Sequence, residues 1–165
     1  MSNNINSFPS KNPLAEIFSS IDNGEITSNQ ESIFWGIFNA SPTGLVLVDK
    51  SNYIRHINKT WKDCMCIDEM YSVGKRFGDG FRCIESLTNG CGNGEHCIIC
   101  NINNTVTQVL ETGIPSYDII LRNEFIVNDS GISPWYKATF IPVFYDGEKS
   151  VLIAADDIMK LQPQI

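Results

Sequence analysis

The order of strand-like and helix-like segments is the feature that most limits the fold of this 165-residue chain. Residues 44–49 (GLVLVD) and 53–58 (YIRHIN) are strand-forming runs around a short Lys-Ser-Asn turn, which predicts a β-hairpin. Strand-like runs at 116–127, 135–144 and 150–156 come later, joined by the turn-forming stretches NDSGIS and DGE. With helices between the two groups, this order predicts an α+β fold: a five-stranded antiparallel sheet with its helices packed on one face.

Two of the predicted helices carry their own start and stop signals. Residues 59–67 follow Asn58, which is a suitable N-cap. Residues 102–111 place Val106 and Val109 at helical spacing, and Gly113 ends the helix. The connection 74–82 between these helices is rich in glycine, and we expect it to be irregular.

A third predicted helix, within SNQESIFWGIFNAS at 28–41, carries more apolar surface than a helix usually buries against its own core. Phe34, Trp35 and Phe38 fall within five positions. Such a helix either packs on its own domain or joins a second copy of the chain. We expect a homodimer, with this helix in the interface.

Length and composition set the domain organisation. A chain of this length suits one domain with one core. Residues 1–28 are rich in Asn and Ser and predict a flexible arm, residues 29–161 the domain, and residues 162–165 a short tail.

Charge and hydropathy exclude several classes of partner. The formal net charge of −7 argues against a nucleic-acid partner, because phosphate binding needs basic surface. No stretch has the eighteen or so apolar residues that cross a bilayer, and the N-terminus does not resemble a secretory signal. These features predict a cytoplasmic protein that acts without a membrane.

Four cysteines are the strongest chemical signal. Cys83, Cys91, Cys97 and Cys100 follow the spacing C-x7-C-x5-C-x2-C, with glycines at 90, 92 and 94. Thiolates are soft ligands that suit Zn²⁺ or an iron–sulfur cluster, and both commonly take four. Two alternatives stay open: a metal-free dithiol switch, with Cys97 and Cys100 as its pair, or plain packing of small apolar groups. We expect all four sulfurs to converge on one metal site.

The other candidate residues give weaker signals. Cys64 and Cys66 point to different faces of a helix and are expected to pack. Asn101 stands where covalent haem attachment requires histidine, so no such haem is expected. His56 is expected to be a hydrogen-bonded sheet residue, and His96 a solvated one. The sequence has no nucleophile with a neighbouring base, and we expect no enzyme.

Three stretches resemble the PAS sensor domain: FNASPTGLVLVDKSNYIRHINKTW at 38–61, ETGIPSY at 111–117 and VLIAADDIMKL at 151–161. The segment GDGFRCIESLTNGCGNGEHCIICNINNTV is similar to a cysteine-rich PAS variant of bacterial sensor histidine kinases. The resemblance implies the strand order 2-1-5-4-3 and a role in signal perception, in a family whose members bind haem, flavin, metabolites or iron–sulfur clusters.

Together, these readings predict a module of a two-component system. It would perceive redox state or a gas through the four-cysteine metal site and pass the signal to a partner protein such as a histidine kinase. The alternatives are a small thiol–disulfide redox protein that uses Cys97 and Cys100, and a zinc-stapled interaction domain.

Overall fold

The computed structural model describes residues 28–157. The predicted arm and the predicted C-terminal tail therefore lie outside the described residues, apart from Ser28. The chain divides between Ile37 and Phe38 into two compact units. Most of helix α2 (Ser28–Ala40) belongs to the first unit, and all other described elements belong to the second.

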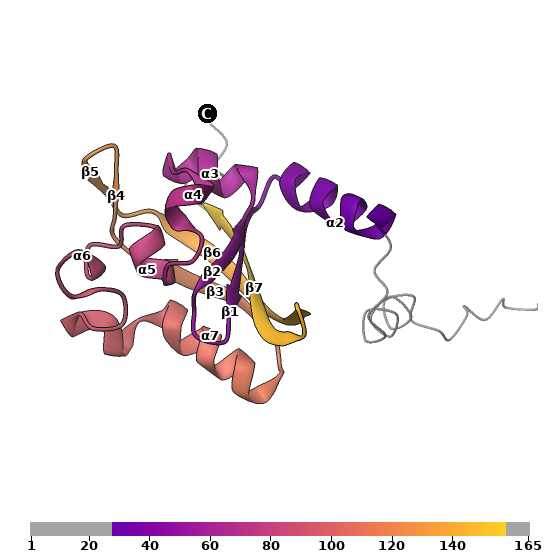
Figure 1. Cartoon of the computed structure of the whole chain (residues 1–165). Coiled ribbons are helices and arrows are strands. Elements are labelled where there is room, and N and C mark those ends of the chain that lie inside the picture. The colour runs from indigo at the N-terminus through magenta and orange to yellow at the C-terminus, as the bar shows by residue number, and fades with distance from the viewer. Residues whose placement is uncertain (1–27, 158–165) are drawn as a thin grey trace, which may run out of the picture. The chain divides into compact units, whose positions relative to one another are not determined.

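The second unit is built on a five-stranded antiparallel sheet with the order β2-β1-β7-β6-β3 (Figure 1). Its strands are β1 (Gly44–Asp49), β2 (Ile54–Ile57), β3 (Ser116–Arg122), β6 (Trp135–Tyr145) and β7 (Glu148–Asp157). The first strand pairs with both the second and the last. The α+β class and the predicted strand order 2-1-5-4-3 are confirmed.

The predicted strand 116–127 is wrong in one respect, because it is two strands in two sheets. β3 ends at Arg122, and β4 (Phe125–Val127) pairs instead with β5 (Ser130–Ile132) in a separate two-stranded sheet. Asn128 and Asp129 both have positive φ, of 48° and 59°. Two such residues form the tight hairpin turn that matches strand twist, so the chain reverses here.

The helices of the second unit lie along one side of the sheet (Figure 1). They are α3 (Lys59–Met65), α4 (Glu69–Ser72), α5 (Phe77–Gly80), α6 (Ser86–Asn89), the 3₁₀ helix η1 (Glu95–Ile99) and α7 (Asn101–Thr112). The expectation that 74–82 is irregular is wrong for α5. Helices of four residues are too short to show an apolar period, which explains why the sequence did not reveal them.

Start and stop signals place α3 and α7. Asn58 accepts a hydrogen bond from the Trp61 backbone at 3.0 Å, as an N-cap does. Gly113 ends α7 with a φ of 68°, a left-handed conformation that favours glycine. Val106 and Val109 of α7 are buried in the core between helices and sheet, as predicted.

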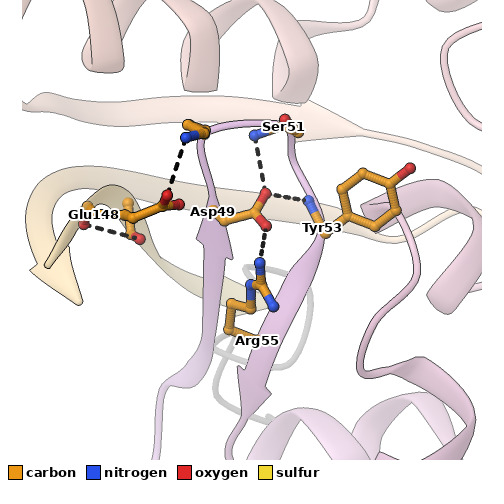
Figure 2. A network of polar contacts seen from close by, with 7 residues as sticks. Asp49, Ser51, Tyr53, Arg55 and Glu148 are labelled. Carbon is orange, nitrogen blue, oxygen red and sulfur yellow. Dashed lines mark hydrogen bonds and ion pairs between the residues drawn. The ribbon is translucent and has the colours of Figure 1, made fainter. Parts of the chain in front are cut away.

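The turn between β1 and β2 is fixed by Asp49 (Figure 2). Its carboxylate accepts hydrogen bonds from the backbone N–H groups of Ser51 at 2.9 Å and Tyr53 at 3.0 Å. It also pairs with the Arg55 guanidinium at 2.6 Å. The exposed pair of Lys50 and Glu148, at 3.0 Å, joins this turn to the start of β7.

Helix α2 was predicted to present Phe34, Trp35 and Phe38 to a dimer partner, and this is wrong for Phe38. Ile33, Phe34 and Ile37 are exposed, but Phe38 is only 4 % exposed and packs within the second unit. Phe38 is therefore not available to a partner.

Within the described residues, no helix combines the length and apolar character that a bilayer crossing requires.

Candidate functional site

Cys83, Cys91, Cys97 and Cys100 line one cavity of about 20 Å³. That volume is about the room that one water-sized group needs. The remaining wall is formed by apolar and small polar residues from α5, α6, α7 and the β3–β4 segment: Phe77, Gly78, Ser86, Ile102, Asn103, Asn123 and Phe125. The structure thus brings the four predicted residues together, while their role as metal ligands stays a prediction.

Cys83 reaches the cavity because the backbone around it is paired on two sides. Its N–H donates to the Gly78 carbonyl at 2.8 Å, and it forms an isolated antiparallel bridge with Phe125. The Ile84 N–H donates to the Glu124 carbonyl at 3.0 Å, which continues that pairing. The cysteine segment is therefore joined to β4 by backbone hydrogen bonds.

Cys91 is the most buried of the four. Its backbone N–H donates to Asp79 Oδ1, and its carbonyl accepts from Arg76 Nη1, both at 2.8 Å. Its sulfur accepts a hydrogen bond from the Gly78 N–H at 3.3 Å. Three residues close in sequence thus fix the backbone and the sulfur of Cys91.

Cys97 and Cys100 belong to the entry of helix α7. Cys97 lies in η1, and Cys100 is the N-cap of α7; the Cys100 N–H donates to the Cys97 carbonyl at 3.2 Å. Both are half-buried. Both line the cavity, as their i, i+3 spacing allows.

Two glycines permit the close packing of sulfur. A Cβ on Gly78 would lie 2.9 Å from Cys91 Sγ, and a Cβ on Gly94 would lie 2.7 Å from the Glu85 carbonyl oxygen and 3.2 Å from Cys97 Sγ. No larger residue fits at Gly78 unless a sulfur moves. Local sequence did not single out Gly78, because its two closest contacts are with Cys91, thirteen residues away.

Burial governs the ionisation of the two inner thiols. Burial raises the pKa of Cys83, and the neighbouring thiols of Cys100 and Cys91 raise it further. Burial also raises the pKa of Cys91, partly offset by the Gly78 N–H. Both groups therefore favour the neutral thiol unless a cation stabilises the thiolate.

The donor set suits a soft metal, but the side chains do not form a closed ligand shell. Four thiols are the ligands that structural zinc and iron–sulfur clusters take. Among residues 28–157, however, no group of three or more His, Cys, Asp or Glu side chains is close enough to hold an ion as placed. Metal binding would require the cysteine side chains to turn inward.

The weaker candidates are also placed. Cys64 and Cys66 are exposed, so the prediction that they pack is wrong: both lie near the end of the short helix α3. His96 is exposed and bonds Glu85 at 3.0 Å. His56 is half-buried on β2, with Nε2 2.6 Å from the Tyr145 hydroxyl, as expected of a hydrogen-bonded sheet histidine.

Sequence comparisons find no relatives, whereas structural comparisons do. No family model matches the chain, and no curated protein matches it. A PAS domain of a protein from Colwellia psychrerythraea superposes with a TM-score of 0.54 at 16% identity, covering 79% of this chain and 98% of the other. A PAS domain of an HTR-like protein from Haloarcula marismortui gives 0.52 at 15% identity, covering 79% and 99%. The chain has the PAS fold.

A further PAS domain, from a two-component sensor histidine kinase, superposes with a TM-score of 0.54 at 6% identity and covers 79% of this chain. Likeness at such identities extends to the fold alone. The similarity of the cysteine segment to a PAS variant of sensor kinases therefore rests on its sequence. In this PAS fold, the cavity lies between the short helices and α7.

Proposed function

We propose that this PAS chain is a sensory module that perceives redox state or a gas through its four-cysteine cavity. The observation that carries the proposal is that the four thiols of residues 83–100 line one cavity. Packing alone does not require this arrangement, and soft thiol donors are the ligands of zinc and iron–sulfur sites. Metal binding would offset the free-energy cost of ionising the thiols of Cys83 and Cys91 in their buried positions.

The size of the cavity favours one metal form over the other. About 20 Å³ suits a single ion, whereas an iron–sulfur cluster of several atoms would need the cysteine segment to open. We therefore favour Zn²⁺, bound after the cysteine side chains turn inward, and keep the cluster as the form that an opened segment would hold.

The output would be a change in how the module docks on another protein. The cysteine segment is joined to β4 by backbone hydrogen bonds and leads directly into α7, which packs on the sheet. A change in the cavity therefore reaches the five-stranded sheet through α7, and the separate β4–β5 hairpin through the backbone pairing of Cys83. We propose a cytoplasmic homodimer that signals to a partner such as a histidine kinase, with binding rather than catalysis as its activity.

A metal-free dithiol switch is the second candidate. The positions of the thiols favour this switch, because no three of the described cysteines are close enough to bind one metal ion as placed. Cys97 and Cys100, half-buried and three residues apart, would form its disulfide.

Anaerobic purification followed by metal analysis and a visible spectrum separates these functions. One zinc per chain without colour would support the single ion, and brown protein with charge-transfer bands the cluster. Metal-free protein that reversibly loses two thiols on oxidation would support the switch. Metal-free protein whose thiols do not respond would overturn a sensory role for the cavity.

A further inference from the structure

The metal-ligand prediction does not include two polar groups beside the Cys91 sulfur. One is the backbone N–H of Gly78, which donates to the sulfur at 3.3 Å, and the other is the side-chain amide of Asn103, which lines the same cavity. Asn103 lies in the first turn of α7 and lines the cavity beside the four cysteines. Sulfur is a weak acceptor when it is neutral and a stronger one when it is ionised.

The orientation of the Asn103 amide is set from the β1–β2 turn. The Asn52 side-chain nitrogen donates to Asn103 Oδ1. Because the Asn103 oxygen accepts this hydrogen bond, the Asn103 NH₂ group remains available to donate toward the cavity. Asn52 is only 5 % exposed and has a φ of 63°, so the turn holds it in one place.

The position of Gly78 is also fixed by hydrogen bonds. Its carbonyl accepts from the Cys83 N–H at 2.8 Å and from Ser86 Oγ at 2.9 Å. Its missing side chain leaves the space that the Cys91 sulfur occupies. The same residue therefore donates to one cysteine and fixes the backbone of another.

We propose that Gly78 and Asn103 are positioning residues that together hold the Cys91 sulfur at the cavity, and that Asn52 sets the orientation of Asn103. This inference deepens the proposed function and rests on it for its purpose, but the contacts themselves exist in the metal-free chain. Outer-shell donors of this kind orient a ligand and stabilise its ionised form once metal is bound.

The contacts are tested first on the reduced, metal-free chain by NMR hydrogen exchange. Cys91→Ala removes the acceptor, so exchange of the Gly78 amide should accelerate about fivefold or more, and the Asn103 side-chain resonances should shift. Asn52→Gly keeps the left-handed backbone and removes the amide, and it should shift the same Asn103 resonances. Cys66→Ala, at an exposed cysteine, is the control. Unchanged exchange and shifts in Cys91→Ala would overturn the proposal.

The consequence for the site is tested by anaerobic cobalt(II) titration, read by the thiolate-to-cobalt absorption. Asn103→Ala and Asn52→Gly should each weaken cobalt binding about 10- to 100-fold, while Gln108→Ala, exposed on the same helix, should leave it unchanged. Wild-type affinity in Asn103→Ala would overturn the positioning role. If the wild type shows no thiolate-to-cobalt absorption, the proposed metal function is overturned. The contacts around the Cys91 sulfur are then still decided by the hydrogen-exchange data.

Discussion

At the scale of single residues, Asn58 shows how a side-chain amide organises this PAS fold. Asn58 is fully buried and uses both ends of its amide. Its oxygen accepts from the N–H groups of Leu45 and Trp61, and its nitrogen donates to the carbonyls of Phe38 and Thr43. One residue thus caps α3 and ties it to the start of β1 and to the end of α2.

Asn58→Ala should lower the free energy of unfolding by about 2–4 kcal/mol, because it removes a helix cap and leaves several buried backbone groups unpaired. Equilibrium urea unfolding measures this change. Asn93→Ala, at an exposed asparagine with one side-chain hydrogen bond, should change the same quantity by less than about 0.5 kcal/mol. Equal losses in the two variants would contradict the role given to Asn58.

The cap at Asn58 was predictable from sequence, whereas the role of Gly78 was not. A cap acts on residues three positions away, and local sequence contains that information. Gly78 matters because of Cys91, and only the folded chain brings the two together. The exposure of Cys64 and Cys66 also depends on how the folded chain packs, so the sequence predicted their helix but not that they would be exposed at its end.

At the scale of elements, β2 and the end of β6 meet through a histidine and a tyrosine. The His56 and Tyr145 rings pack edge to face with their centroids 5.1 Å apart. Burial lowers the pKa of His56 below its ordinary value of 6.5, Glu69 opposes the shift, and Arg55 adds to it. In the folded chain, His56 therefore takes up a proton less readily than in the unfolded chain.

This shift predicts a specific dependence of stability on pH. As the pH falls through 6.5, the unfolded chain binds the proton first, so the free energy of unfolding should fall until the pH is below the lowered pKa. His56→Gln should flatten the curve between about pH 7 and pH 5, as measured by urea unfolding at each pH. Parallel curves for wild type and His56→Gln would show that the His56 pKa is not shifted.

Helix α2 carries the proposed dimer contact. Ile33, Phe34 and Ile37 are exposed, and apolar side chains gathered on one helix favour association. Phe34→Asp should move the elution volume in size-exclusion chromatography from dimer to monomer without lowering the unfolding midpoint. Lys59→Asp, at an exposed residue of α3, is the control. A wild type that already elutes as a monomer would remove this proposal.

Elements differ in how well their sequence predicts them. β6 and β7 alternate in burial over part of their length, and β1 is a short apolar run bounded by turn residues, so both kinds of pattern are readable from the sequence. Helices α4, α5 and α6 have four residues each and show no period. The β4–β5 hairpin was missed because its strands have three residues each, and its Asn-Asp turn resembled an ordinary connection.

At the scale of the whole molecule, the short helices, α7 and the segment between β3 and β4 line a cavity whose wall carries four cysteines. The four cysteines that the sequence singled out all line this cavity, while their convergence on one metal centre stays a prediction, because no three of the described metal-binding side chains are close enough to hold an ion. The sequence could not predict the packing of the cysteine segment on Phe125 and Asn103, because those contacts span long separations in the chain. The cavity connects to the five-stranded sheet through α7, which is the proposed route by which chemistry at sulfur would alter docking.

Metal content per chain in a series of single Cys→Ser variants, purified without oxygen, tests the central claim most directly. If the four thiols share one metal site, each replacement at Cys83, Cys91, Cys97 and Cys100 should reduce bound zinc or iron to a small fraction of the wild-type value. Cys64→Ser and Cys66→Ser, at exposed positions outside the cavity, should retain it. Retention of full metal content after replacement of any one of the four, or its loss in the two controls, would contradict the account.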